Sequence, residues 1–320
     1  MGKGTIVVAT VWRGRLMQAW RVVALGLALG LLTGCGLMAL AQTAANPDRT
    51  PHTAKLDAKS WSKKNAKVKI ALASDSTVQE SSGWGNGFAA CLTPDVDLLN
   101  LAVGGRSSRS YREEGRWAQV LSLKPDYVLV GFSHNDASKN KPEVYVTPDD
   151  FRVRIDQFVD EARAAGIKIV LMTQITSKRF DKDGKIENLA GAEIYDGITR
   201  EEAKAKHVPL MDMAAVSTAY FMSIGVDKTN ALTPVHNGKL DAAHLNAEGS
   251  VVVGKMAAEE LKKAVPELAQ YVKLGSGNAY ICRDRYWVEL LPVGDCVGAA
   301  AQAEDSGGRP RGDAAGRERL

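Results

Sequence analysis

The sequence predicts an α/β domain of three-layer α/β/α architecture, with a central, mostly parallel sheet of about five strands between two layers of helices. Two observations predict it. Apolar residues form five continuous runs, whereas strands with one face in water alternate apolar and polar residues. Segments with helical periodicity separate several of these runs, and such alternation is typical of parallel sheets.

The five expected strands follow one another from residue 67 onward. They are KVKIALA (67–73), VDLLNLAV (96–103), PDYVLVGF (125–132), IKIVLMT (167–173) and the shorter HVPLMDM (207–213). Because each run is apolar throughout, we expect these strands to be buried on both faces.

The clearest expected helix covers residues 148–166. Its apolar residues recur at helical spacing on one face, Pro148 stands in its first turn and Gly166 follows its end. Residues 193–206 and 247–265 have the same character. These helices connect consecutive parallel strands or follow the last one.

Composition and charge exclude some partners. The chain has 320 residues, of which 45% are hydrophobic and 6% aromatic, with a net charge of +4. The whole excess comes from four basic residues near the N-terminus, Lys3, Arg13, Arg15 and Arg21. The rest of the chain is therefore neutral, and it has no concentrated basic face with which to bind nucleic acid.

The N-terminus is expected to be a targeting segment, because basic residues precede the apolar run 22–32. LTGC (32–35) has the form of a bacterial lipoprotein signal that leaves a lipidated Cys35, whereas ALA (39–41) permits ordinary secretory cleavage before Gln42. A transmembrane anchor is the third alternative. Each alternative moves the body across a membrane, so we expect a periplasmic or outer-membrane lipoprotein, or a secreted protein.

Composition also divides the chain into segments. The expected segments are a signal segment (1–41), a polar, Pro-containing linker (42–66), the α/β domain (67–273) and a C-terminal extension (274–320) that is disordered from about residue 297. Cys282 and Cys296 are close enough in sequence for a local disulfide, and Cys91 is expected to be a small buried side chain.

Chemically useful residues follow the expected strands. In open parallel sheets, ligands bind at the carboxyl ends of the strands. Those ends, and a loop before the last helix, carry Ser76, the pair Gly104–Gly105, Asn135, and the pair Asp241 and His244. Together they supply a nucleophile, oxyanion donors and an oriented base, which are the parts needed for acyl transfer.

Each of these residues also has a simpler interpretation. Ser76 could cap a helix, and the glycine pair could serve only a tight turn. Asp241 and His244 could instead bind a metal together with His236. Their order and positions, taken together, favour the catalytic interpretation.

In four blocks the chain resembles the SGNH, or GDSL-type, hydrolase superfamily, and within it the rhamnogalacturonan acetylesterase group. The blocks are ASDSTV (73–78), NLAVGGRSSRSY (100–111), GFSHND (131–136) and DAAHLN (241–246). They occur in the order of the family. The resemblance implies the flavodoxin-like SGNH hydrolase fold.

The resemblance also implies a role for each matching residue. Ser76 would be the nucleophile, and Asp241 and His244 would complete the triad. The oxyanion donors would be the backbone N–H groups of Ser76 and Gly105 and the side-chain amide of Asn135. No metal or other cofactor is implied.

Two arginines and two departures from the family pattern accompany these blocks. Arg106 and Arg109 could contact an acidic polysaccharide, or they could pair with carboxylates of neighbouring helices. Ser74 and Ser133 stand where the family usually has glycine, and we expect them to narrow the site slightly.

The resemblance implies a serine esterase that hydrolyses O-acetyl esters on a plant cell-wall polysaccharide of the pectic type. The partners expected are therefore an acetylated polysaccharide and, through Cys35, a membrane, but no nucleic acid. The alternatives are the same chemistry on xylan acetate or a lipid, a metal-dependent hydrolase, and an inactive carbohydrate-binding protein.

Overall fold

The structure is a computed structural model that describes residues 56, 59–189, 191–274, 280–283 and 286–289. The expected signal segment with Cys35, most of the expected linker, Cys296 and the expected disordered tail lie outside the described residues. Among the helices that are described, none has both the length and the apolar character needed to cross a membrane.

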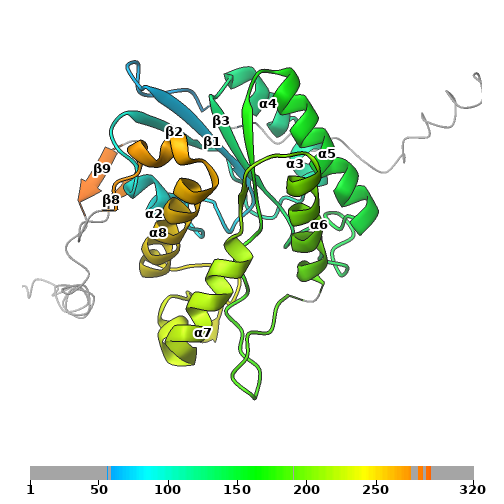
Figure 1. Cartoon of the computed structure of the whole chain (residues 1–320). Helices are drawn as coiled ribbons and strands as arrows, with labels where there is room; N and C mark the ends of the chain where they lie inside the picture. Colours follow the sequence, from blue (N-terminus) through cyan, green and yellow to red (C-terminus); the bar gives the residue numbers. More distant parts are fainter. Residues whose placement is uncertain (1–55, 57–58, 190, 275–279, 284–285, 290–320) are drawn as a thin grey trace, which may run out of the picture. The chain divides into compact units, whose positions relative to one another are not determined.

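The domain is built on a five-stranded sheet in which all neighbouring strands are parallel. The strands are β1 (Val68–Ser74), β2 (Val96–Asn100), β3 (Tyr127–Gly131), β4 (Lys168–Met172) and β5 (Leu210–Met211), in the spatial order β2-β1-β3-β4-β5 (Figure 1). The expected sheet is therefore confirmed. This strand order is that of a doubly wound fold, in which the carboxyl ends of the central strands form the usual ligand site.

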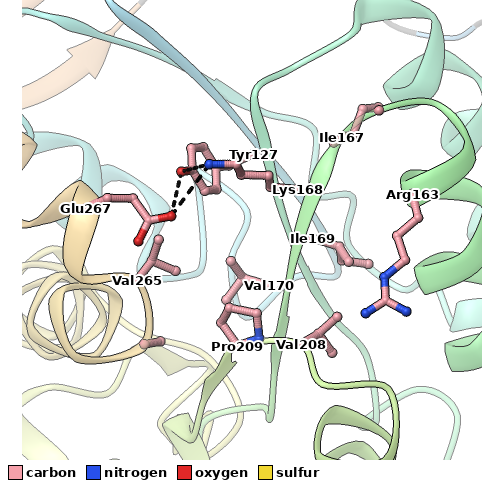
Figure 2. Close-up of a pocket in the computed structure, with 12 residues that line it drawn as sticks. Tyr127, Arg163, Ile167, Lys168, Ile169, Val170, Val208, Pro209, Val265 and Glu267 are labelled. Atoms are coloured by element: carbon pink, nitrogen blue, oxygen red, sulfur yellow. Dashed lines mark hydrogen bonds and ion pairs between the residues drawn. The ribbon is translucent and has the colours of Figure 1, made fainter.

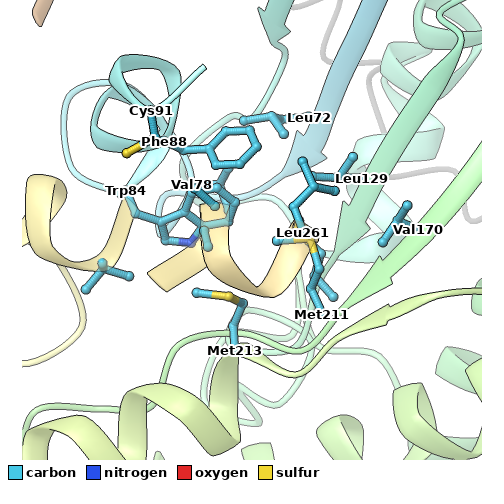
Figure 3. Packing of buried hydrophobic residues seen from close by; sticks show 14 of the residues in the cluster. Leu72, Val78, Trp84, Phe88, Cys91, Leu129, Val170, Met211, Met213 and Leu261 are labelled. Atoms are coloured by element: carbon cyan, nitrogen blue, oxygen red, sulfur yellow. The ribbon is translucent and has the colours of Figure 1, made fainter. Parts of the chain in front are cut away.

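One face of the sheet packs against α2 (Gly85–Ala90), α7 (Met213–Ala231) and α8 (Ala247–Ala264). The buried residues there come from these helices and from alternate positions of the strands, and the largest side chains are Trp84 and Phe88 (Figure 3). Alternation places Ile70 and Leu72 on this face. The strand positions between them point to the other layer.

The opposite face packs against α3 (Ser108–Glu113), α4 (Arg116–Leu123), α5 (Pro148–Ala164) and α6 (Ala192–Ala205). Burial here centres on aromatic rings, with Phe132 stacked on Phe158 at 5.7 Å between ring centroids. Helix α5 begins as expected, because the Thr147 side chain accepts a hydrogen bond from the Asp150 N–H and proline occupies the first turn. The two helical layers complete the three-layer architecture.

Helices α2 and α8 approach each other through glycines. A methyl group at Gly254 would lie 2.2 Å from the Gly87 carbonyl carbon, and one at Gly87 would lie 1.9 Å from the Ser250 carbonyl oxygen. Both distances are far below van der Waals contact. Only glycine therefore lets α8 pack tightly against α2, which closely follows the carboxyl end of β1.

The last part of the sheet differs from the expectation. Strand β5 covers only two residues, and Met213, expected in a strand, begins α7 instead. The reason is the Asp212 side chain, which accepts a hydrogen bond from the Ala215 N–H and so caps the helix. Helix α7 is apolar around most of its circumference and is interrupted at Gly225, where φ is +78°.

Shorter elements complete the described chain. They are the antiparallel pair β6 (Val235–His236) and β7 (Lys239–Leu240), the 3₁₀ helix η1 (Pro266–Tyr271), and the antiparallel pair β8 (Tyr280–Arg283) and β9 (Tyr286–Glu289). The pair β6–β7 directly precedes Asp241 in the chain.

The end of the segment expected to be a linker contacts the domain. Trp61 Nε1 donates to the Leu123 carbonyl at 2.8 Å, and the Lys63 N–H donates to Asp97 Oδ2 at 2.6 Å. Cys91 is a free, buried thiol. Burial raises its pKa to about 11, so it stays protonated and behaves as an apolar side chain.

Candidate active site

Ser76, His244 and Asp241 form a continuous hydrogen-bonded series at the carboxyl edge of the sheet. His244 Nε2 lies 2.8 Å from Ser76 Oγ, and His244 Nδ1 lies 2.7 Å from Asp241 Oδ2. Ser76 follows the end of β1, whereas the other two residues lie in the loop before α8. The fold thus brings together side chains separated by 168 positions in the chain, in the arrangement that nucleophilic catalysis requires.

The Asp241 carboxylate is held from both of its oxygens. Oδ2 contacts the His244 ring, and Oδ1 accepts the N–H groups of Ala243 and His244 at 3.1 and 3.3 Å. Burial acts to raise the pKa of Asp241, but the hydrogen bonds from His244 and the backbone outweigh burial and hold that pKa below its ordinary value. The carboxyl group is therefore ionised and oriented, as a residue that fixes an imidazole must be.

Two backbone donors beside Ser76 are free to bind a ligand. The N–H groups of Ser76 and Gly105 donate to no acceptor within the described part of the chain. Gly104 lies against Ser76, because a methyl group placed on it would be 3.4 Å from Ser76 Cβ. Free N–H groups next to a serine hydroxyl are the arrangement that stabilises an oxyanion.

Asn135 lies at the same edge, but its amide is already engaged. The nitrogen Nδ2 donates to the Arg106 carbonyl at 3.1 Å and to Asp75 Oδ2 at 3.2 Å. An oxyanion can use this amide only by sharing one of these hydrogen bonds or displacing its acceptor. The developing negative charge favours that exchange, since hydrogen bonds to ionised acceptors are the stronger ones.

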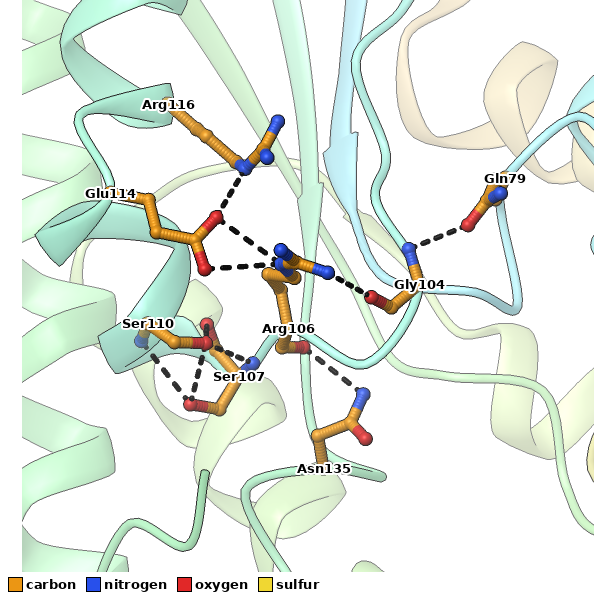
Figure 4. Close-up of polar contacts among 8 residues, drawn as sticks. All are labelled: Gln79, Gly104, Arg106, Ser107, Ser110, Glu114, Arg116 and Asn135. Carbon is orange, nitrogen blue, oxygen red and sulfur yellow. Dashed lines mark hydrogen bonds and ion pairs between the residues drawn. The ribbon is translucent and has the colours of Figure 1, made fainter. Parts of the chain in front are cut away.

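The two candidate substrate-binding arginines have partners within the protein. Arg106 pairs with Glu114 at 3.1 Å (Figure 4), and Arg109 Nη2 donates to the carbonyls of Pro142 and Glu143 at 3.0 and 2.9 Å. Arg109 Nε is buried without a partner among the described residues. These contacts support the structural role that the sequence left open for Arg106, and contact of either residue with substrate stays a prediction.

Ser74 and Ser133 do not line the accessible surface of the site, so the expected narrowing is wrong. Both side chains are fully buried. Ser74 Oγ donates to the Gly131 carbonyl at 2.6 Å and accepts from Gln174 Nε2 at 3.1 Å. Its hydroxyl therefore joins β1, β3 and the loop after β4 beneath the site.

The alternative metal centre would need His236 beside Asp241 and His244. His236 Nε2 lies 3.7 Å from Asp241 Oδ2, and its side chain is 69% exposed. Across the described ranges, no three His, Cys, Asp or Glu side chains gather closely enough to hold a metal ion. The three residues are thus not arranged as a ligand set.

Lys178 is a residue of this edge that the sequence analysis missed. It is buried, and both its backbone N–H and its Nζ donate to the Ala242 carbonyl at 2.9 Å. It therefore holds the loop that carries Asp241 and His244. Lys178 follows β4, so the same reasoning from strand ends that found Ser76 would have found it.

The environment of Lys178 shifts its titration. Burial lowers the pKa of Lys178 to about 7, although the Asp241 carboxylate acts in the opposite direction. Burial likewise lowers the pKa of the neighbouring His134; the Asp75 carboxylate opposes that shift, whereas Lys178 and His244 add to it. Both groups therefore lie in a setting that disfavours their charged forms.

We expect the stability of the protein to rise with pH as a result. An unfolded lysine titrates near 10.5, so between about pH 7 and pH 9 the unfolded chain binds more protons than the folded one. A full proton corresponds to about 1.4 kcal/mol per pH unit, which in a domain of this size raises Tm by several degrees over the interval. Lys178→Met should remove this slope. Thermal melts at the two ends of this pH interval measure how steeply Tm rises with pH. An equal rise for the variant and the wild type would contradict the low pKa assigned to Lys178.

A separate surface depression of about 350 Å³ lies at the other edge of the sheet. It is lined by the first residues of β3 and β4, where Lys168 Nζ donates to Tyr127 Oη at 2.9 Å and Tyr127 donates to Glu267 (Figure 2). None of the expected site residues lines it. The triad instead lies on an open rim, with the Asp241 and His244 side chains 25% and 29% exposed.

Comparison with known proteins gives consistent relatives. Residues 70–251 match the model of the GDSL-like lipase/acylhydrolase family. The chain is 30% identical over 203 residues to the probable rhamnogalacturonan acetylesterase YesY of Bacillus subtilis, covering 61% of this chain and 92% of the relative. It is 28% identical over 232 residues to the rhamnogalacturonan acetylesterase RhgT of the same organism, covering 67% and 98%.

A solved structure shows the same fold. The crystal structure of the YxiM protein of Bacillus subtilis superimposes with a TM-score of 0.54 at 24% identity, over 61% of this chain and 56% of that chain. Residues 70–251, which match the family model, contain all the sequence blocks from which the site was assembled.

Proposed function

This chain belongs to the GDSL-like lipase/acylhydrolase family, in its rhamnogalacturonan acetylesterase-like group, and is a carboxylic ester hydrolase; from that premise we propose that it removes O-acetyl groups from a pectic polysaccharide through an acyl-enzyme on Ser76. The observation that carries the proposal is the series Ser76–His244–Asp241 with contacts of 2.8 and 2.7 Å beside two free backbone N–H groups.

In the proposed first step, His244 Nε2 takes the proton of Ser76 Oγ while Oγ forms a bond to the ester carbonyl carbon. The tetrahedral intermediate collapses as the sugar oxygen leaves, and His244 returns the proton to it. Water then attacks the acetyl-enzyme in the same way, with His244 again acting as the base. Acetate leaves and Ser76 regains its proton, so no other reactant is required.

The negative charge of each tetrahedral intermediate falls on the former carbonyl oxygen. The free N–H groups of Ser76 and Gly105 are the donors we propose for it. Asn135 joins them by sharing the amide that now contacts Arg106 and Asp75. These donors act mainly on the transition state, because the carbonyl oxygen of the bound ester carries much less charge.

Asn135→Ala tests this part of the mechanism. Loss of one oxyanion donor typically lowers kcat by roughly 10²–10³-fold, and we expect the lower end because the amide must first give up part of an existing hydrogen bond. KM should change little. The melting temperature should fall by a few degrees, since the contacts with Asp75 and Arg106 are lost as well. A stable variant with wild-type kcat would remove Asn135 from the oxyanion site.

The substrate class is tested by a panel of esters. Acetylated rhamnogalacturonan, acetylated xylan and a lipid ester are incubated with the full chain, and the released acid is measured. The proposal expects the highest kcat/KM on the pectic substrate, and preference for xylan or lipid would overturn that part. EDTA in the same assay should leave the rate unchanged, whereas inactivation that zinc reverses would favour the metal-dependent alternative.

We further propose that the protein acts outside the cytoplasm, as the N-terminal sequence indicates. If Cys35 is lipidated, the protein from its native host should partition into detergent. A soluble form that begins at Gln42 would instead identify ordinary secretory cleavage.

A further inference from the structure

Arg106 is held at its guanidinium end by a buried carboxylate. Its Nε lies 3.1 and 3.2 Å from the two oxygens of Glu114, which also accepts from Arg116 Nε at 2.6 Å (Figure 4). The side chains of Glu114 and Arg116 are only 15% and 8% exposed. Burial acts to raise the pKa of Glu114, but the hydrogen bonds from Arg116 and Arg106 hold that pKa below its ordinary value.

The same guanidinium also holds the glycine turn next to Ser76. Arg106 Nη1 donates to the Gly104 carbonyl at 2.9 Å, and Gln79 Oε1 accepts the Gly104 N–H at 2.5 Å (Figure 4). The Arg106 carbonyl in turn accepts from Asn135. A single residue therefore contacts the turn that carries one proposed oxyanion donor and the side chain that provides another.

Packing does little to fix the Gly105 side of this turn. Gly105 has φ of +75°, and a side-chain methyl group there would find no atom within 4 Å. Adjacent glycines have the widest conformational freedom of any residue pair. The direction of the Gly105 N–H must therefore be set by hydrogen bonds to the turn.

Peptide geometry connects the Arg106 contact to that direction. The peptide unit that joins Gly104 to Gly105 is planar and trans, so its C=O and N–H point in opposite directions. When Arg106 holds the Gly104 oxygen, it directs the Gly105 N–H away from the guanidinium. That N–H, like that of Ser76, has no acceptor among the described residues.

We infer that Arg106, anchored by Glu114, is a positioning residue that sets the direction of the Gly105 N–H in the oxyanion site. The inference rests on the proposed esterase function and deepens it. It also assigns Arg106 a role other than contact with an acidic substrate, because its Nε and Nη1 are already engaged with Glu114 and Gly104.

The test compares Arg106→Met, Arg106→Lys and Glu114→Gln with the wild type. Each is assayed on p-nitrophenyl acetate, which is small and uncharged, and on acetylated pectin. We expect kcat to fall by roughly 10- to 100-fold on both substrates, as a small misplacement of an aligned group does, with KM nearly unchanged. Lysine should not rescue the rate, since an ammonium cannot reproduce the planar contacts with Glu114 and Gly104 together.

Arg112→Met is the matched control. Arg112 also forms a two-point pair with a glutamate, Glu161, at 3.1 and 2.6 Å, but it does not touch the glycine turn. This variant should have a lower melting temperature than the wild type but the same kcat. The rate at which a serine-directed phosphonate labels Ser76 should fall in the Arg106 variants and not in the control.

Two outcomes would overturn the inference about Arg106 while leaving the proposed esterase function intact. One is normal kcat on p-nitrophenyl acetate with a raised KM for pectin, which would identify Arg106 as a substrate contact. The other is a rate loss in Arg112→Met equal to that of the Arg106 variants, which would indicate general destabilisation. If Arg106→Met does not fold, the kcat values of Glu114→Gln and Arg106→Lys decide between these outcomes. A wild-type protein inactive on every ester would overturn the proposed function, and the inference with it.

Discussion

Ser76→Ala is expected to abolish ester hydrolysis, with kcat reduced by roughly 10⁶-fold, the loss seen when a triad nucleophile is removed. Among the described residues, Ser76 Oγ is the one hydroxyl in contact with His244 Nε2, so no other hydroxyl there can replace it. The fold should be unaffected. The Ser76 side chain lies at a strand end, and within the described residues its one hydrogen bond is to His244, so the melting temperature should stay within a degree or two of the wild type. The assay is acid release from p-nitrophenyl acetate and acetylated pectin.

Labelling provides the control for this variant. A serine-directed phosphonate should modify Ser76 alone, and peptide mapping by mass spectrometry should find no label in Ser76→Ala. Ser122→Ala, which changes an exposed hydroxyl on α4, should keep both the activity and the label. Label on another serine, or substantial activity in folded Ser76→Ala, would refute the nucleophile. Wild-type protein that binds pectin without releasing acid would favour the inactive binding protein.

The sheet could be predicted from sequence because its strands are buried on both faces. Strands β2, β3 and β4 and helices α5 and α8 lie within the segments that predicted them, whereas β1 and α6 are each offset by one residue from theirs. The residues at which the strands end were predicted less accurately. Leu101, Ala102 and Phe132 are buried beyond their strands, and an apolar run alone does not tell a buried loop from a strand.

The elements that were missed have no such pattern. Helix α2 is six residues long and contains two glycines, of which Gly87 is required by the close approach to α8. Helix α3 is also six residues long and begins with a capping box formed by Ser107 and Ser110. Helix α7 is apolar on most sides, so its periodicity is weak.

The residues of the site also divide into those that the sequence could identify and those that it could not. Ser76, Asp241 and His244 could be named because the resemblance supplied them and strand ends placed them at one edge. Gln79 and Glu114 could not, since each acts on a backbone N–H or on another side chain. Such contacts depend on how loops pass one another in space. The sequence shows only that a polar residue is present.

Asp241→Asn is expected to lower kcat by about 10⁴-fold while preserving the fold, the loss seen when the aspartate of a serine protease triad becomes asparagine. The contacts of this carboxylate give the physical reason. The position of Oδ1 faces two backbone N–H groups, those of Ala243 and His244. An asparagine oxygen will occupy that position, because an amide NH₂ there would meet two donors. The NH₂ group then faces His244 Nδ1, which must become the acceptor.

That reversal places the ring proton on Nε2, the atom that faces Ser76 Oγ. A protonated Nε2 cannot accept the serine proton, so His244 can no longer act as the base. KM should change little, because the substrate does not contact Asp241 in the proposed mechanism. Asp95→Asn, which removes only an exposed ion pair with Lys67, should keep wild-type kcat. A folded Asp241→Asn protein within tenfold of the wild-type kcat would mean that His244 does not need this carboxylate for its orientation, and the triad would have to be abandoned.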